Sequence, residues 1–168
     1  MRSDGFTLIE LITVMILIGI LAAVGLGRID YSGAFDQRAV LDKTKAALEF
    51  ARKSAVAQRR YVCILIAGNK LVLSIDSRDP DTGPGFICSS GSSAPLALPV
   101  PDKSCSGGQT NAVCATAPSV TLKAGGTVAT CAASYGFNFN PQGQPSIPVA
   151  ICANGLSAVV EADTGYVH

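Results

Sequence analysis

The N-terminal part of the chain carries a long, almost purely apolar pattern. From Phe6 to Leu26 it runs for 21 residues with apolar side chains at nearly every position, and Glu10 is the only charged residue among them. As a helix this run would be about 31 Å long, close to the hydrocarbon thickness of a bilayer. The pattern predicts a membrane-spanning or assembly helix over residues 6–27, preceded by a short polar leader, residues 1–5.

A second pattern, from Ser32 to Arg60, is amphipathic rather than uniformly apolar. Apolar side chains recur at spacings of three, four and seven residues, which indicates one face of a helix; they are Val40, Leu41, Ala47, Leu48, Ala51 and Ala55. Basic residues lie mostly off this stripe, and no proline interrupts it. We expect residues 28–60 to form a helix that continues the first as one rod and packs its apolar face on a sheet.

The pattern changes after residue 60, and residues 61–168 are expected to form a β-rich domain. β-Branched and aromatic residues occupy Tyr61–Ile66 and Leu71–Ile75, with Gly68-Asn69 between them, which predicts a hairpin. Similar signals predict a second hairpin, Ser119–Ala124 with Thr127–Thr130, and a third, Ser157–Ala162 with Gly165–Val167.

One further strand is expected where Tyr135, Phe137 and Phe139 alternate with smaller residues, up to Asn140-Pro141. Residues 80–118 are rich in Pro, Gly and Ser and are interpreted as a long loop. The expected fold class is therefore α+β: a long N-terminal helix packed on an antiparallel, β-rich C-terminal domain.

Six cysteines modify this picture: Cys63, Cys88, Cys105, Cys114, Cys131 and Cys152. None forms a Cys-x-x-Cys pair, so the clustered ligands of a zinc site are absent from the sequence. The even number favours disulfides in an oxidising compartment. The connectivity stays open among 15 possibilities, and a buried free thiol is an alternative for Cys63, which lies in an apolar run.

The charge distribution and the residue types argue against nucleic-acid binding and against catalysis. The net charge is +1, and residues 61–168 carry four Lys or Arg against six Asp or Glu, so the β-rich part lacks the basic surface expected of a nucleic-acid-binding domain. No catalytic set is visible, because the only histidine is the terminal His168 and no phosphate-binding glycine motif is present. We expect no enzymatic activity, no cofactor and no metal.

Glu10 is the residue that an ordinary membrane anchor does not explain. A carboxylate deep in a membrane helix costs roughly 2–4 kcal/mol, so it normally has a partner or a function. The segment around it, Gly5-Phe6-Thr7-Leu8-Ile9-Glu10, resembles the processing motif of type IV pilins and of the pseudopilins of type II secretion.

This resemblance implies a role for each motif residue. A membrane peptidase would cut between Gly5 and Phe6, and the same enzyme system would N-methylate Phe6. Glu10 would pair with the Phe6 ammonium of its own or a neighbouring subunit, which replaces an uncompensated buried charge with an ion pair. The implied partners are other pilins in a helical filament, the prepilin peptidase/N-methylase and an inner-membrane assembly platform. The implied location is the bacterial inner membrane with a periplasmic domain, and then a periplasmic or cell-surface filament.

The rest of the chain narrows the resemblance. Residues 46–62, the segment 137–144 and the C-terminal 164–168 are similar to GspH/FimT-like minor pilins and pseudopilins, with MSHA-type minor pilins as an alternative. The expected function is a structural subunit of a type IV pilus or a type II secretion-type filament. The alternative is an adhesive or DNA-binding pilin acting in attachment or natural transformation. Some FimT-like proteins bind DNA through basic residues near the C-terminal glycine motif, but Thr164–His168 contains no Lys or Arg.

Two polar clusters are candidate binding sites. Asp76, Asp79 and Asp81 could supply oxygen ligands to Ca²⁺, but Arg78 and Pro80 interrupt the spacing, and a solvated turn is the better interpretation. The amides of Asn138, Asn140, Gln142 and Gln144 could face a partner or a sugar. Turn chemistry at a strand end is the preferred interpretation for them.

Overall fold

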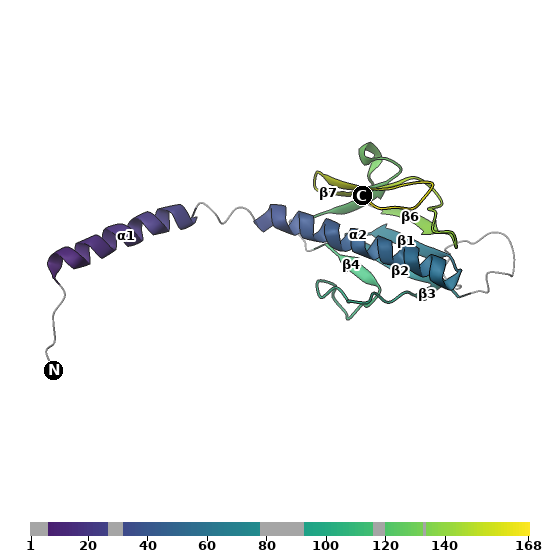
Figure 1. Ribbon diagram of the computed structural model, residues 1–168, viewed down its shortest axis with the longest axis horizontal. Coiled ribbons are helices and arrows are strands. Elements are labelled where there is room, and N and C mark those ends of the chain that lie inside the picture. Colours follow the sequence, from purple (N-terminus) through teal and green to yellow (C-terminus); the bar gives the residue numbers. More distant parts are fainter. Residues whose placement is uncertain (1–6, 27–31, 78–92, 116–119, 133) are drawn as a thin grey trace. The chain divides into compact units, whose positions relative to one another are not determined.

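The computed structural model describes residues 7–26, 32–77, 93–115, 120–132 and 134–168 (Figure 1). The chain divides into two compact units, Met1–Ala34 and Phe35–His168. The leader, Phe6 and the junction 27–31 lie outside the described residues, so the expectation of one continuous rod stays a prediction.

The first unit contains α1, Leu8–Leu26, and its start has a clear local cause. The carbonyl of Thr7 accepts the N–H groups of Glu10 (3.1 Å) and Leu11 (3.2 Å), and its Oγ1 lies 3.4 Å from the Glu10 nitrogen. Threonine in this position satisfies backbone donors that a helix start leaves free.

A search of the described helices for the length and apolarity that a membrane crossing requires finds none that qualifies.

The second unit is organised around α2, Ser32–Gln58. All six residues of the predicted apolar stripe are buried, including Leu48, Ala51 and Ala55 at 0% exposure. The helix ends in a left-handed residue, Arg59 (φ 50°), and the Arg60 N–H donates to the Ala55 carbonyl at 3.1 Å. This is the hydrogen-bonding pattern of a Schellman C-cap, with arginine where glycine is usual. The amphipathic helix is confirmed.

The larger sheet has five strands: β1 (Val62–Ala67), β2 (Lys70–Asp76), β3 (Ser93–Pro95), β4 (Ala112–Cys114) and β6 (Ser134–Phe139). Its order is β3-β2-β1-β6, and β4 also pairs with β2. β1 and β2 form the first predicted hairpin, and both turn residues, Gly68 and Asn69, have positive φ (57° and 61°). A turn of this kind matches the twist of the strands it joins.

The predicted loop 80–118 is partly wrong. Residues 78–92 and 116–119 lie outside the described residues, but β3 and β4 pair with opposite ends of β2, Ser74 opposite Pro95 and Lys70 opposite Cys114. Three-residue strands are too short to give a periodic signal in the sequence. They form here because they hydrogen-bond to the edge of β2 that β1 does not occupy.

The smaller sheet consists of β5 (Leu122–Gly125), β7 (Val149–Ala153) and β8 (Leu156–Val160), in the order β5-β7-β8. β7 was not predicted, and β8 pairs with it through a turn at Asn154 and Gly155, both with positive φ. The third predicted hairpin is therefore only partly confirmed. Val159 and His168 still exchange two backbone hydrogen bonds, 2.9 and 3.0 Å, so the C-terminal segment does lie along β8.

The second predicted hairpin is wrong. Val128–Thr130 forms the 3-10 helix η2, and β5 pairs with β7 instead. Gly125 is needed for a different reason from a hairpin turn. A Cβ at this position would collide with the Thr130 carbonyl, so glycine permits the close approach of η2 to β5.

Helix α2 and both sheets share one hydrophobic core. In Figure 1, α2 lies across the strands of its unit. The predicted alternation in β6 is confirmed, because Phe137 and Phe139 are buried and meet edge to face at 5.6 Å between ring centroids. The fully buried members include Leu48, Ile64, Ile66, Leu71, Leu73, Leu122, Phe139, Ile151 and Val160. The α+β architecture expected from the sequence is confirmed.

The end of α2 provides a stability test. Replacing Arg59 with glycine should raise the free energy of unfolding by about 1 kcal/mol, because glycine adopts the left-handed conformation without a Cβ clash. The Arg59 side chain is exposed, so little packing is lost. The control is Lys53→Gly, at an exposed position inside the same helix, which should cost about 1 kcal/mol. Urea unfolding of the full chain measures both, and an equal effect of the two changes would contradict the capping role.

Candidate functional site

The most unusual surface of the described chain is α1. Its large apolar side chains are exposed on every side of the helix, with Leu8 at 78% and Leu21 at 70%. Eleven such residues are exposed in this helix: Leu8, Ile9, Leu11, Ile12, Val14, Met15, Ile16, Leu17, Ile18, Ile20 and Leu21. An ordinary soluble helix exposes apolar residues singly, so an apolar surface of this extent indicates a surface that is covered in use.

Glu10 is the only charged residue of α1, and it lies in the first helical turn. A carboxylate there interacts favourably with the positive end of the helix dipole. Thr7 and Glu10 have the spacing of a capping box, and the bond from the Glu10 N–H to Thr7 Oγ1 is present at 3.4 Å. The other two residues of the predicted processing site, Gly5 and Phe6, lie outside the described residues, so cleavage, methylation and the Glu10 pairing stay predictions.

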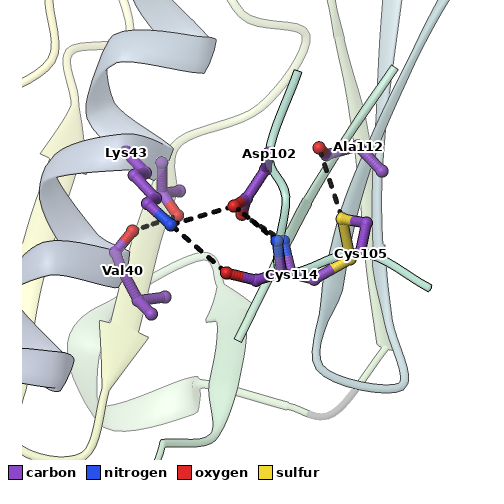
Figure 2. Close-up of polar contacts among 8 residues, drawn as sticks. Val40, Lys43, Asp102, Cys105, Ala112 and Cys114 are labelled. Atoms are coloured by element: carbon purple, nitrogen blue, oxygen red, sulfur yellow. Dashed lines mark hydrogen bonds and ion pairs between the residues drawn. A yellow bond between two sulfur atoms is a disulfide. The ribbon is translucent and has the colours of Figure 1, made fainter. Parts of the chain in front are cut away.

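A second polar centre, which the sequence did not reveal, surrounds Asp102. Figure 2 shows its carboxylate between α2 and the disulfide-linked segment. Oδ1 accepts a hydrogen bond from Lys43 Nζ at 2.9 Å and from the Ser104 N–H at 3.1 Å. Oδ2 accepts the Cys114 N–H at 3.1 Å, a backbone donor of β4. The Asp102 side chain is only 5% exposed, so its charge is held by these donors rather than by water.

The environment of Asp102 sets its pKa. Burial alone would raise the pKa, but the hydrogen bonds from Lys43, Cys114 and Ser104 outweigh burial and hold the pKa of Asp102 below its usual value of 3.8. The folded state therefore favours the charged form. The resulting stabilisation is complete above the unfolded pKa and is lost as the pH falls through the lower, folded pKa.

Beside this centre a groove of about 500 Å³ separates α2 from the segment 98–104. Its walls are mostly apolar: Ala46, Ala47 and Phe50 from the helix, Leu98, Pro99, Val100 and Pro101 from the segment, and Val113 from β4. The polar lining residues are Lys43, Asp102, Lys103 and Ser104. Because Asp102 bonds to Lys43, these polar residues meet α2 at the N-terminal end of the groove.

Disulfides fix the segments around these features. Cys105 pairs with Cys114, with a Cα–Cα distance of 5.2 Å, and Cys131 pairs with Cys152 at 6.4 Å. Cys63 is also disulfide-bonded, so the free-thiol alternative for it is wrong. Cys88 lies outside the described residues. The disulfides that were expected from the even cysteine count are thus present in the described part of the chain.

The predicted amide cluster is a turn. Asn140 Oδ1 accepts the N–H groups of Gln142 (3.0 Å) and Gln144 (2.8 Å), and Asn140 Nδ2 donates to Gln144 Oε1 (3.1 Å). Gln144 Nε2 donates to the Asp163 carbonyl. The side-chain amides of Asn140 and Gln144 thus bond within the chain, which supports the interpretation of these two residues as turn chemistry.

Only Asp76 of the other predicted polar cluster lies among the described residues. Asp76 is buried, and its backbone carbonyl accepts a hydrogen bond from Arg60 at 3.3 Å. Asp79 and Asp81 lie outside the described residues. Among the described side chains, no three acidic, cysteine or histidine residues are grouped as metal ligands.

The Asp102 centre could not have been found from local sequence. Its two principal partners, Lys43 and Cys114, are 59 and 12 residues away, and lysine on the solvated face of a helix gives no signal of pairing. The only available clue was a lone acidic residue, Asp102, three positions before a cysteine in a segment otherwise poor in charge.

Known proteins share the N-terminal motif and the fold of this chain. A profile of the prokaryotic N-terminal methylation motif matches residues 1–26. Among solved structures, the chain is similar to the type IV minor pilin FimU of Pseudomonas aeruginosa strain PAO1, with 19% sequence identity, a TM-score of 0.51, and coverage of 82% of this chain and 90% of that one. A search of the curated proteins found no significant match.

A second solved structure gives the same result. The minor pseudopilin EpsH from the type 2 secretion system of Vibrio cholerae is 9% identical, with a TM-score of 0.53 and coverage of 79% of this chain and 94% of that one. At these identities the likeness concerns the fold. The N-terminal methylation motif and the pilin-like fold both agree with the resemblance at Gly5–Glu10.

Asp102 provides a second test. Asp102→Asn should lower the free energy of unfolding by about 1–3 kcal/mol at neutral pH, because the amide cannot accept all three bonds. The control is Asp42→Asn, an exposed position on α2. In wild type, stability should fall as the pH drops below 3.8, and this part of the loss should be absent in Asp102→Asn. Thermal unfolding from about pH 2 to about pH 7 measures the stability at neutral pH and its dependence on pH. Parallel pH profiles for wild type and Asp102→Asn would contradict the role assigned to Asp102.

Proposed function

We propose that this chain is a structural minor pilin or pseudopilin subunit of a type IV pilus or of a type II secretion-type filament. The single observation that carries the proposal is the pairing of a prokaryotic methylation motif with an exposed apolar helix that has one carboxylate in its first turn. The pilin-like fold of the second unit supports it.

The apolar composition of Phe6–Leu26 supports storage in the bacterial inner membrane as part of this proposal. Lipid would cover the apolar side chains of α1, and the second unit would face the periplasm. The cost of Glu10 in lipid would be met by a nearby ammonium group. After cleavage between Gly5 and Phe6 by the prepilin peptidase, the new N-terminus would supply this group, and N-methylation would leave it a cation.

Assembly then exchanges lipid contacts for contacts between helices. Lipid tails and leucine side chains are about equally apolar, so leaving the membrane for a bundle of helices yields little hydrophobic free energy. Close packing and polar pairing therefore decide whether the exchange occurs. We propose that Glu10 of one subunit pairs with the Phe6 ammonium in the filament, with the assembly platform driving extraction, and that this pair sets the register between helices.

The chain itself would carry out no catalytic step. It is a substrate of the peptidase and N-methylase and otherwise acts by binding its neighbours. The alternative of a DNA-binding pilin gains no support from the C-terminal segment, where His168 Nε2 lies 2.8 Å from Glu161 Oε1 and no Lys or Arg is present.

Mass spectrometry of sheared filaments and of the remaining inner membrane tests the proposal. The expected result is a chain that begins at methylated Phe6 in one of the two fractions. A surface pilus predicts the chain in sheared filaments, and a secretion pseudopilus or a priming subunit predicts processed chain in the membrane only. Chain that retains Met1–Gly5 in cells containing the peptidase would overturn the proposal.

Glu10 provides the third prediction. Glu10→Gln should leave cleavage after Gly5 intact but reduce filament incorporation or Phe6 methylation roughly tenfold or more, because the ammonium loses its charged partner. The control is Thr13→Val, a polar position one turn further along α1 whose hydroxyl bonds only to the Glu10 carbonyl in the described chain. Quantitative mass spectrometry of both fractions measures the effect, and normal incorporation of methylated Glu10→Gln would contradict the pairing.

A further inference from the structure

The groove between α2 and the segment 98–104 is open and apolar, and no part of the described chain fills it. Val100, on its outer wall, is 81% exposed, and Phe50 on the helix is only partly buried. On the helix side the lining includes two small side chains, Ala46 and Ala47. A volume of about 500 Å³ is enough to accept an aromatic side chain with part of its backbone.

The charges at the groove favour the binding of a negatively charged group. Asp102 is 5% exposed and accepts three hydrogen bonds, so its charge is shielded from the outside. The Lys43 side chain is 45% exposed, and Lys103 is exposed next to it in the lining. The charge that an approaching group meets is therefore positive.

The same chain carries a complementary feature at the start of α2. Phe35 is 73% exposed, and Asp36, also exposed, follows it. Aromatic side chains are enriched in protein interfaces. An aromatic side chain next to a carboxylate matches an apolar groove with ammonium groups at its polar end.

Phe35 cannot fill the groove of its own chain. It precedes Lys43 by eight residues and Phe50 by fifteen, about 12 and 22 Å along the helix axis. One straight helix holds all three residues, so the ring and the groove can meet only between two copies. Contacts between two different patches are heterologous, and such contacts build open assemblies rather than closed dimers when the rotation does not close.

We propose that the groove receives Phe35 of a second copy of this chain, with Asp36 of that copy beside Lys103. The contact rests on the proposed function and deepens it, because it names a surface outside α1 through which neighbouring subunits recognise each other. It would also fix how far one subunit is displaced along the helix axis relative to the next.

Site-specific photocrosslinking in the full chain tests the contact. A benzoylphenylalanine at position 35 is irradiated in cells that make the filament, and the products are separated into filament and membrane fractions. The expected product is a dimer of this chain in which position 35 is joined to residues 98–103 or 43–50. The matched control carries the probe at Val56, which is 47% exposed on α2 but does not line the groove, and should give no such product.

Two sets of variants make the test specific. Ala46→Trp, which fills the groove from an exposed helix position, should reduce the dimer at least fivefold, whereas Ala57→Trp, at an exposed alanine elsewhere on α2, should not. Asp36→Lys or Lys103→Glu alone should each reduce the dimer about two- to fivefold, the range of an exposed ion pair. The two changes together should restore it to within about twofold, because the pair is re-formed with reversed charges.

The outcomes separate this contact from the proposed function. If the chain is processed and enters filaments, but position 35 yields no dimer or joins only to a different protein, the groove contact is overturned and the filament role stands. If a groove-linked dimer forms but the chain keeps its leader, the filament role is overturned and the contact stands. Equal dimer yields from Ala46→Trp and wild type would also overturn the contact.

Discussion

The packing of α2 against the two sheets is the interaction on which the globular unit depends. Its stripe from Val40 to Ala55 is buried, and the inward faces of β1, β2, β6, β5 and β7 meet it in one cluster. Alanines at positions 47, 51 and 55 let the helix approach the sheets closely, whereas Leu48 fills the space between them. Since a buried leucine or isoleucine contributes roughly 1.5–3 kcal/mol, this seam supplies the cohesion that the short strands could not generate alone.

Polar contacts hold the segment 93–115 against α2. The segment 93–115 contributes only six strand residues, which is too little apolar surface to fix its course. Asp102 compensates by binding Lys43 of α2 and the Cys114 N–H of β4 at once, while the Cys105–Cys114 disulfide restrains the segment behind it. Burying a carboxylate is costly unless each oxygen is satisfied, and here both are. The clamp also leaves the groove beside it open.

The same physics acts with the opposite result in α1. Its large apolar side chains are exposed in the described part of the first unit, and none of them belongs to the core of the second unit. α2 and the sheets hold the second unit together, and α1, to which the proposed assembly role falls, contributes no residue to that core.

The sequence by itself determined those features whose physical cause is local. The apolar run of α1, the stripe of α2, the Gly68-Asn69 hairpin and the alternation in β6 follow from the periods of helices and strands and from the conformational freedom of glycine and asparagine. The Gly5–Glu10 motif likewise indicated the pilin-like class, because its residues are contiguous.

Only the tertiary structure decided the features that depend on distant partners. Val149–Ala153 becomes a strand because β5 and β8 flank it, and Gly125 serves the approach of η2 rather than a turn. Asp102 acquires its role from Lys43, 59 residues away, and the cysteine pairs depend on which strands lie together. Local patterns report how a segment uses its own backbone and faces, but they carry no information about which other segment will supply a hydrogen bond, a charge or a thiol.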